Sequence, residues 1–599
     1  MKIKDTLIYY LLPPVLCLLL GFLLVFSHKG APLEPRPVRL EPLGATETDT
    51  EHRETEILLL AESDSVLLGV VQDTLDEMKI GWVCRDTIEQ NILDSVHSVL
   101  LCAPDLASLR GENAIKLIEW VDQGGRLCLM AAPSRDGWFQ IVSHKLGILE
   151  SGEYFEYHAV NWSDGTRSLF PSLIFDEELE DYTMSVFLEE DCRVLMSTAD
   201  ENQIPLLWGR DLGKGRIAVC NHSLISGKDA RGFVLQALEA IEPVLIYPII
   251  NAGLIYIDDF PAPQPEGFDE NLRAQYGLTT QSFYRNHWWP DMKTLARTYA
   301  LRYTGVLVET YNKNMTPPFI PDMDDNSLIR YYASELLQTG GEIGLHGYNH
   351  QPLCLDGWEY AGEDYITWSS EENMALAVKE LVRYGKSFLP DAEFTSYVPP
   401  SNYLSEEGQK VLLQTVPSLL AISGLYLPEE GVNALVQEFH ENADGSVPVP
   451  RITSGFSMGN YEKTVAEGEL SLHGIFSHFI HPDDVLDEER GALLGWEQLY
   501  QDFNEMLQEV NEAFPALRWC TATEAAAAVQ RYDRVDVERS WEGQTVVLNL
   551  SNFYDEAWFC LSAAEQPLSV EGADIFRAGK DLWLRAYQPE VRLTWENEA

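Results

Sequence analysis

The sequence predicts an α/β protein of several domains, the largest of which is a (β/α) barrel. Its 599 residues exceed what one hydrophobic core normally organises. Apolar runs typical of buried strands alternate with helical patterns from about residue 56 to residue 530. Beyond that point the runs become short and alternating, as in TVVLNLS and VRLTW, and they predict a small antiparallel β domain over residues 531–599.

The first element along the chain is a candidate membrane anchor. Residues 7–26 carry no charge and are long enough to cross a bilayer as one helix. No small-residue cleavage site follows, so we predict an uncleaved anchor over residues 1–29 rather than a removed signal peptide. Basic residues flank both ends and do not decide the orientation. We expect a single-pass protein of the cell membrane with the bulk of the chain extracellular, joined by a Pro-rich linker over residues 30–55.

Residues 56–245 predict a flavodoxin-like α/β domain with a parallel sheet. The strand-like runs EILLLAES, SVLLCAP and RLCLMAAP are separated by helical stretches, among them the amphipathic NAIKLIEWVDQGG. The pattern resembles amidotransferase-like folds, but Cys102 is followed by Ala103 and Pro104 and lacks the glycine-flanked turn that presents a nucleophile. We therefore expect a structural or recognition role for this domain. Most of the nine cysteines lie in apolar runs without metal-ligand spacing, as buried thiols do.

Seven strands are expected in the barrel domain, which we place at residues 246–530. They are 254–259, 304–310, 341–346, 395–399, 418–422, 474–480 and 517–521. Helical stretches, notably 371–385 and 497–514, separate several of these strands. The chemistry of such barrels lies at the C-terminal ends of the strands, which directs attention to the polar residues there.

The first barrel strand, LIYIDDF, ends in two adjacent carboxylates, Asp258 and Asp259. Successive side chains on a strand point to opposite faces, so we expect the two carboxylates to meet different partners.

Histidines follow two later strands of the same domain. GEIGLHGYNH places His346 and His350 four residues apart, a spacing that suits two ligands of one metal ion and, by itself, also fits two surface histidines. GIFSHFIHPDD adds His478 and His481, so four of the 13 histidines fall at strand ends of one domain. One acid and two histidines form a set typical of a catalytic zinc or similar divalent ion.

Of the last two histidines, His481 has the better position for catalysis. His478 and His481 point to opposite faces of a regular strand, so both cannot enter the site. Pro482 ends the strand directly after His481, at the end where barrel chemistry collects. We expect Asp483 or Asp484 to orient the His481 ring and His478 to pack behind it.

The order of these motifs resembles the polysaccharide deacetylases of carbohydrate esterase family 4, the NodB-homology domains, over about residues 250–525. The resemblance implies a (β/α)7 deacetylase barrel and one divalent metal ion, expected to be zinc. It implies the following roles: Asp258 as general base, His481 as general acid, and Asp259, His346 and His350 as metal ligands. The stretches FYRNHWWPDM, ETYNKNMTPPF and PPSNYLS are similar to the membrane-attached deacetylase component of Gram-positive Pel-type exopolysaccharide systems.

The sequence departs from this family in its third motif. The family has an arginine there that orients the base, whereas this chain reads Tyr397-Val398-Pro399-Pro400. Arg451, in VPRITSG, is the candidate to replace it from another loop. We also expect a backbone N–H near Tyr403 to stabilise the oxyanion.

Four aromatic residues are candidates for the walls of a sugar-binding cleft, because aromatic rings suit the apolar faces of hexoses. They are Trp288, Trp289, Tyr311 and Tyr403. Core packing is the alternative for each of them.

The predicted function is metal-dependent N-deacetylation of an extracellular polysaccharide that contains N-acetylhexosamine, in Pel-like exopolysaccharide biosynthesis. The alternative is a catalytically impaired subunit that binds the polymer within an export or assembly complex. The expected partners are the polysaccharide, the membrane through the N-terminal helix, and other exopolysaccharide synthesis or export proteins. The net charge of −52, from 94 acidic and 42 basic residues, argues against nucleic acid as a partner.

Overall fold

The computed structural model describes residues 40–596 apart from short gaps, and Leu40–Ala599 form one compact unit. The residues within this range that are not described are 45–54, 63, 89, 106–108, 110, 164, 167–168, 171–172, 177–178, 262–266, 320–326, 362–363 and 430. The expected anchor and most of the expected linker lie outside the described residues.

The expected transmembrane helix and single-pass membrane location are corrected by the described helices. None of them combines the length and the apolar character that a bilayer crossing requires. The two longest, α11 (Glu371–Phe388) and α14 (Trp496–Ala513), carry charged residues between their buried apolar ones, as amphipathic surface helices do. Residues 1–29, on which the expectation rested, are not among the described residues.

The N-terminal part contains a nine-stranded sheet of order β2-β1-β3-β4-β11-β10-β9-β6-β7. Its strands are β1 (Ile57–Leu60), β2 (Trp82–Arg85), β3 (Ser98–Leu101), β4 (Arg126–Leu129), β6 (Val160–Trp162), β7 (Ile174–Phe175), β9 (Arg193–Thr198), β10 (Pro205–Leu212) and β11 (Gly215–Cys220). The first five strands of this order, β2, β1, β3, β4 and β11, pair with one another in parallel. From β11 onward, the four pairings that add β10, β9, β6 and β7 are antiparallel. The expected parallel sheet therefore accounts for only part of this domain, and the flavodoxin-like class stays a prediction.

Helices and a separate two-stranded ribbon accompany this sheet. The helices are α2 (Val66–Glu77), α3 (Gln90–Leu93), α4 (Glu112–Asp122), α5 (Gly137–Val142), the 3-10 turn η3 (Lys228–Ala230) and α6 (Arg231–Ile241), and the ribbon pairs β5 (Ile148–Tyr157) with β8 (Asp181–Leu188). Cys102 is buried, and burial raises the pKa of its thiol, so the structure gives it no nucleophilic character.

The C-terminal strands form two antiparallel four-stranded sheets, β12-β23-β26-β25 and β21-β22-β27-β24. Their bounds are β12 (Val244–Ile249), β21 (Asp536–Glu542), β22 (Thr545–Ser551), β23 (Ala557–Ala563), β24 (Ser569–Glu571), β25 (Ala573–Ala578), β26 (Asp581–Ala586) and β27 (Glu590–Thr594). β12, which lies at the expected end of the α/β domain, thus joins strands from the end of the chain.

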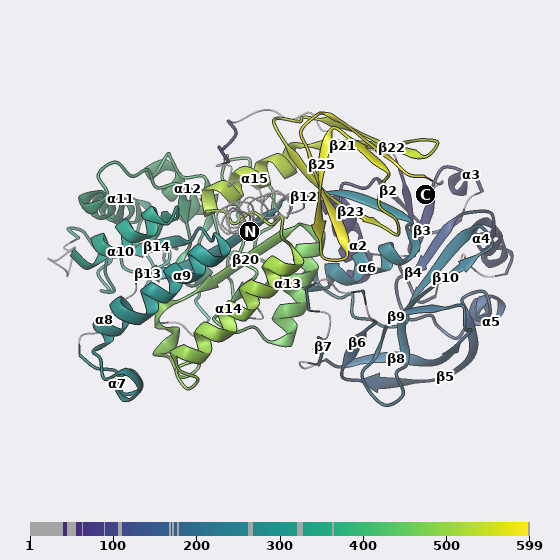
Figure 1. Cartoon of the computed structure of the whole chain (residues 1–599), viewed down its shortest axis with the longest axis horizontal. Coiled ribbons are helices and arrows are strands. Elements are labelled where there is room, and N and C mark those ends of the chain that lie inside the picture. The colour runs from purple at the N-terminus through teal and green to yellow at the C-terminus, as the bar shows by residue number, and fades with distance from the viewer. Residues whose placement is uncertain are drawn as a thin grey trace, which may run out of the picture. The chain divides into compact units, whose positions relative to one another are not determined.

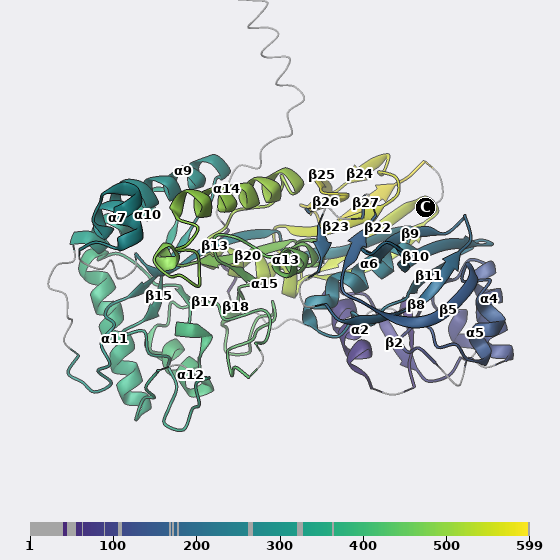
Figure 2. The same cartoon turned by 90° about the horizontal axis from the view of Figure 1, so that it is seen from below.

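The central part contains a parallel eight-stranded sheet of order β18-β17-β16-β15-β14-β13-β20-β19. The strands are β13 (Ala252–Phe260), β14 (Thr304–Val308), β15 (Glu342–Gly347), β16 (Ser396–Tyr397), β17 (Ala421–Ile422), β18 (Val447–Pro448), β19 (Thr453–Ser454) and β20 (Ile475–Ile480). The other elements are α7 (Glu270–Tyr276), α8 (Thr280–Phe283), the π-helical turn η4 (Tyr284–Trp288), α9 (Trp289–Tyr299), α10 (Ser327–Gln338), η5 (Pro400–Asn402), α12 (Glu406–Thr415), α13 (Asn460–Leu472), η6 (Pro482–Val485) and α15 (Ala522–Arg534), with α9 and α14 side by side (Figures 1 and 2).

The two edge strands of this sheet, β18 and β19, belong to one extended segment, residues 447–455. Its first half bonds to the β17 side, where Val449 N–H donates to the Ile422 carbonyl at 3.1 Å. Its second half bonds to β20, where Ile452 N–H donates to the Ser477 carbonyl at 2.9 Å. The segment changes partners between residues 451 and 452 and so links both edges of the curled sheet.

The observed strands differ from the seven expected ones in two places. Residues 517–521 form no strand, because Thr521 caps helix α15 directly after a single bridge from Trp519 to Gly253. Strands β18 and β19 were not expected, because Pro448 and Pro450 interrupt the strand pattern there. The sheet therefore has eight strands instead of seven.

Candidate active site

Asp258 and Asp259 lie at the C-terminal end of β13, where the strand is irregular. The pairing with β14 passes from Ile257–Gly305 to Phe260–Leu307, so two residues of β13 oppose one residue of β14. This is a β-bulge, and Asp259 within it has a φ of +53°. The bulge brings both carboxylates to the same mouth of the sheet, instead of to the opposite faces expected for a regular strand.

His346, the residue before the last in β15, has a free ring nitrogen directed at Asp259. Its Nδ1 lies 2.8 Å from the Val398 carbonyl, an acceptor only, so Nδ1 carries the proton and Nε2 has a free lone pair. This Nε2 lies 3.7 Å from the Asp259 Oδ1. Burial lowers the pKa of His346 to about 4, which keeps the ring neutral, as metal ligation requires.

His350 completes a group of three potential ligands. Its Nε2 lies 3.4 Å from the Asp259 Oδ1, and its ring is 5.0 Å from that of His346 in an edge-to-face arrangement. Burial lowers the pKa of His350 to about 4 as well. One ligand atom from each of Asp259, His346 and His350 lies within 4.8 Å of the others.

These three side chains fit a divalent metal ion. The Asp259 Oδ1 is buried and has no hydrogen-bond partner, so a cation there would satisfy it. Two neutral imidazoles and one carboxylate are ligands that suit zinc and other divalent transition metals. The Val398 carbonyl supplies the outer hydrogen bond that fixes the His346 tautomer in such sites.

Asp258 is held by an arginine from the segment that links the two sheet edges. Arg451 Nη1 donates to the Asp258 Oδ2, and Arg451 Nη2 donates to the Asn402 Oδ1. Arg451 itself is buried, with its guanidinium 4.1 Å from the centre of the Phe479 ring. Burial favours a higher pKa for Asp258, but the opposing charge of Arg451, with smaller effects from His346 and His481, leaves it below its usual value. Asp258 is therefore ionised and able to accept a proton.

His481 lies on the other side of Asp258. Its Nε2 is 3.9 Å from the Asp258 Oδ2, and its ring is about a quarter exposed. On its other side, Nδ1 faces the Asp484 Oδ1 at 3.7 Å, and Arg490 Nη1 lies 3.0 Å from that same oxygen. Asp484, rather than Asp483, is thus the carboxylate that faces the His481 ring.

His478 is directed away from this group. Its ring is fully buried, with Nδ1 2.8 Å from the Thr453 hydroxyl and Nε2 2.6 Å from the Gly455 carbonyl. Phe476 and Phe503 stack on it. Both ring nitrogens therefore have structural partners.

Two of the four candidate sugar-binding aromatics lie near the site. Tyr311 is 45 % exposed, and its ring centre is 5.8 Å from that of His350. Tyr403 is buried, and its hydroxyl accepts a hydrogen bond from the Ala361 N–H at 3.3 Å. The expected oxyanion contact is not available from Tyr403 itself, because its N–H donates to the Pro400 carbonyl at 3.1 Å.

Trp288 and Trp289 are not brought to a cleft. Both are completely buried, and they stack on each other with ring centres 5.8 Å apart. Trp288 packs against Trp496 of α14, and Trp289 against Tyr332 of α10. Their expected role in sugar binding is corrected to the alternative, core packing between helices.

Three further residues around the site were not expected from the sequence. Asn402 shares Arg451 with Asp258, and Arg490 pairs with Asp484. The Tyr365 hydroxyl lies 3.4 Å from the His350 Nδ1 and 2.5 Å from the Ser401 hydroxyl. Tyr365 and Arg490 lie outside helices and strands and Asn402 ends the short turn η5, and such segments carry no periodic pattern that would have revealed them.

Unusual backbone conformations cluster at this mouth. Asp259, His350, Ser401 and Asn402 are non-glycine residues with φ between +42° and +62°. Each such residue costs about 1–2 kcal/mol, so surrounding contacts must hold it. Strained positions of this kind gather at functional sites.

The fold is similar to that of a solved carbohydrate deacetylase. The structure of Agd3, described as a novel carbohydrate deacetylase, superposes with a TM-score of 0.55 at 10 % identity, covering 91 % of this chain and 99 % of its own. A putative polysaccharide deacetylase from Mycobacterium smegmatis matches 47 % of this chain and 91 % of its own, with 15 % identity and a TM-score of 0.30. BA3943, a CE4 family pseudoenzyme from Bacillus anthracis, matches 44 % and 61 %, with 9 % identity and a TM-score of 0.23. The likeness of fold rests on Agd3.

The chain belongs to the family described as uncharacterised protein conserved in bacteria (DUF2194), whose model matches residues 158–584. A search of curated proteins finds no match.

Proposed function

We propose that this protein is a metal-dependent N-deacetylase acting on a polysaccharide that contains N-acetylhexosamine. The observation that carries the proposal is the convergence of Asp259, His346 and His350 on one side of Asp258, with His481 on its other side. A ligand set, an ionised carboxylate and a histidine thus line one mouth of the sheet. Metal-assisted hydrolysis of an amide has a use for each of them.

The residues divide the work of amide hydrolysis between them. A divalent ion held by Asp259, His346 and His350 would supply a Lewis acid that polarises the acetyl carbonyl and lowers the pKa of water. Asp258, kept ionised by Arg451, accepts the proton of the water that attacks the carbonyl carbon. His481, oriented by Asp484, donates a proton to the departing nitrogen. Acetate and a free amine leave.

The polymer is inferred from the surroundings and from the resemblance in sequence. Tyr311, half exposed beside His350, offers an aromatic ring to a sugar next to the metal ligands. The stretches similar to Pel-type deacetylases support an exopolysaccharide as substrate, with the proteins that synthesise or export it as partners. The net charge of −52 favours a product polymer that has gained amines.

The test is metal-dependent acetate release by the purified protein. Oligomers of N-acetylglucosamine and of N-acetylgalactosamine are incubated with the protein as purified, after chelation, and after zinc or cobalt is restored. We expect release that is lost on chelation and returns with metal, and about one metal ion per chain in wild-type protein but not in His346→Ala or His350→Ala. Metal-loaded protein that binds the oligomers without releasing acetate would instead establish the binding-only alternative.

A further inference from the structure

A segment outside the proposed site, residues 435–441, bonds to residues 424–426, which in turn pair with the backbone of Arg451. Leu425 N–H donates to the Leu435 carbonyl, and Gln437 N–H donates to the Leu425 carbonyl, both at 2.9 Å. On the far side of Leu425, Tyr426 N–H donates to the Arg451 carbonyl at 2.9 Å. Residues 424–426 thus lie between residues 435–437 and Arg451, and they pair with both.

Gly424 makes this arrangement especially close. A Cβ atom added there would lie 2.3 Å from the Leu435 carbonyl oxygen, so only glycine allows the two backbones to approach in this way. Gly424 N–H donates to the Gln437 Oε1 at 2.7 Å, and its carbonyl accepts from Arg451 N–H at 2.9 Å. A shift of residues 435–437 is therefore passed to the backbone of Arg451.

A second connection runs through Asn402. Leu435 N–H donates to the Asn402 carbonyl at 2.7 Å, and the side chain of Asn402 accepts from Arg451 Nη2. The other guanidinium nitrogen of Arg451 holds Asp258. Two of the groups that orient Arg451, its own backbone and Asn402, are thus connected to residues 435–437.

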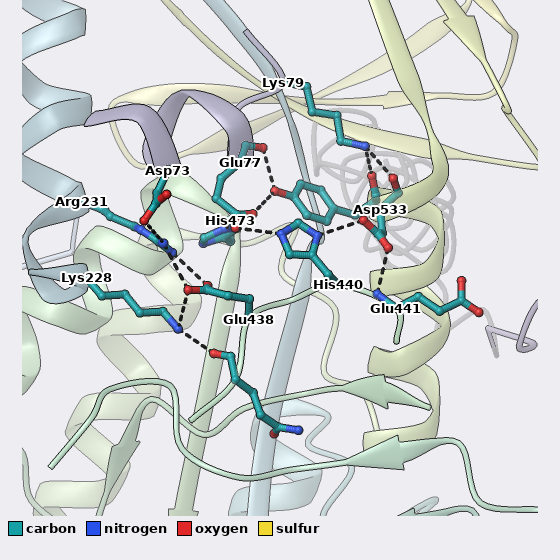
Figure 3. Close-up of polar contacts among 12 residues, drawn as sticks. Asp73, Glu77, Lys79, Lys228, Arg231, Glu438, His440, Glu441, His473 and Asp533 are labelled. Carbon is teal, nitrogen blue, oxygen red and sulfur yellow. Dashed lines mark hydrogen bonds and ion pairs between the residues drawn. The ribbon is translucent and has the colours of Figure 1, made fainter. Parts of the chain in front are cut away.

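Two cationic side chains of the N-terminal part, Arg231 and Lys228, bind residues 437–438 of this segment (Figure 3). Arg231, the first residue of α6, makes a two-pronged ion pair with Glu438 at 3.0 and 3.2 Å. It also donates to the Tyr426 hydroxyl at 3.1 Å. Lys228 Nζ lies 3.0 Å from the Glu438 Oε1 and donates to the Gln437 carbonyl at 2.6 Å. Arg231 is 3 % exposed, and two-pronged pairs of this kind fix geometry as well as charge.

The C-terminal end of the segment, His440 and Glu441, is held by other residues. His440 lies between Glu77 of α2, at 3.0 Å, and Asp533 of α15, at 2.9 Å, and Glu441 N–H donates to Asp533 at 2.8 Å (Figure 3). Contacts at residues 437–438 and at residues 440–441 thus hold residues 435–437 against Gly424 and Asn402.

From these contacts we infer that Arg231 and Lys228 are positioning residues for Asp258, acting through Glu438, Gln437 and Arg451. The inference rests on the proposed function of Asp258 as the base, and it gives the N-terminal α/β part a role in catalysis without any contact with the substrate. Loss of Arg231 lets Arg451 shift, so Asp258 meets the attacking water in a poorer geometry. Asp259 on β13, His346 on β15 and His350 just after β15 all lie outside residues 424–451, so we expect them to keep their positions.

The experiment compares three variants of the full-length, metal-loaded protein. Arg231→Met removes the ion pair with Glu438, and Arg231→Lys restores a cation. The control is Lys580→Met, which removes an ion pair between Glu239 of the same helix and Lys580 in the turn between β25 and β26. Hydrogen exchange of the amides of residues 424–426, 435–437 and 451, metal content, kcat and KM are measured for each.

We expect Arg231→Met to exchange these amides faster and to lose on the order of 10-fold in kcat, with KM and metal content unchanged. Arg231→Lys should recover part of kcat, and Lys580→Met should match wild type in both readouts. Wild-type exchange in Arg231→Met, faster exchange without loss of kcat, or an equal loss in Lys580→Met would overturn the inference. If Arg231→Met does not fold, Glu438→Gln serves with the same readouts. A wild-type protein without acetate release would contradict the proposed function, whereas unchanged exchange would contradict this inference alone.

Discussion

At the scale of single residues, the two aspartates of LIYIDDF have different surroundings although they are adjacent. Arg451 holds Asp258 ionised, whereas Asp259 has a buried oxygen without a hydrogen-bond partner that faces two neutral histidines. The sequence was sufficient to propose both residues, because their motifs are local. It was insufficient to place them, because the bulge that brings them together depends on pairing with β14.

The first prediction separates these two aspartates. Asp258→Asn keeps the shape of the side chain but cannot take a proton, so we expect it to retain metal and to lose 10²-fold or more in kcat, a loss on the order of that expected for a general base. Metal content by elemental analysis and acetate release are measured on the same sample. Loss of the metal together with activity would make Asp258 a ligand instead.

The second prediction distinguishes the roles of His478, within β20, and His481, directly after it. His481→Ala should abolish acetate release with metal retained, because His481 faces Asp258 from the open side of the site. His478→Ala should lower the melting temperature and leave the kcat of the folded fraction nearly unchanged, because its ring is packed between Phe476 and Phe503. The opposite pattern would exchange the two roles.

At the scale of elements, the sequence predicted the strands that have long apolar runs and missed the short strands that have none. Six of the seven expected barrel strands lie within or overlap observed strands, since apolar runs identify buried strands well. The two-residue strands β18 and β19 have no such run. Trp288 and Trp289 were open to two interpretations, because a sequence does not distinguish an aromatic pair in a core from one that binds a sugar. Their contacts with α10 and α14 show that they pack in the core.

Glu309, directly after β14, is expected to make the stability of the protein depend on pH. It is 3 % exposed, neither oxygen has a hydrogen-bond partner, and Arg383 of α11 is 3.8 Å away. Burial, with the neighbouring Glu380, raises the pKa of Glu309 to about 8. A carboxyl whose pKa is raised on folding favours the folded state fully at low pH, and this contribution falls as pH rises from about 4.5 towards 8.

Glu309→Gln replaces this group by one that stays neutral. We expect the variant to melt at a higher temperature than wild type at pH 9, with a smaller difference or none at pH 5. Glu393→Gln, on an exposed residue after α11, is the matched control. Equal shifts of the melting temperature at both pH values would show that Glu309 is ionised at neither or at both.

At the scale of the whole molecule, buried histidines join parts that are distant in sequence. His473, at the end of α13, is completely buried between Glu469 at 2.6 Å and Glu77 of α2 at 3.1 Å. Burial opposes its charge, but the two carboxylates outweigh burial and raise the pKa of His473 to about 9. Glu469 and His473 lie one helical turn apart, but only tertiary packing brings Glu77 to them, and no sequence pattern indicates that contact.

His473 therefore makes stability depend on alkaline pH. A histidine whose pKa is raised on folding stabilises the protein fully below about pH 6.5, and this stabilisation is lost as pH rises through about 9. We expect His473→Gln to melt at a lower temperature than wild type at pH 6, with the gap narrowing by pH 10. His158→Gln, on an exposed residue, should show no such narrowing. A gap of constant size would mean that His473 is not protonated in the folded protein.

The extended segment that links both edges of the barrel also bears on the order in which the protein folds. The contact between Arg451 and Asp258 spans 193 residues of sequence, and β13 pairs with β20, which is synthesised later still. Contacts between residues so far apart form slowly, because the intervening chain must first lose much of its freedom. During synthesis, β13 to β17 leave the ribosome before their closing partners exist, with the edge of β13 unpaired. We therefore expect the catalytic mouth to be the last part of the barrel to assemble, and nascent chains that stop before residue 447 to be prone to aggregation.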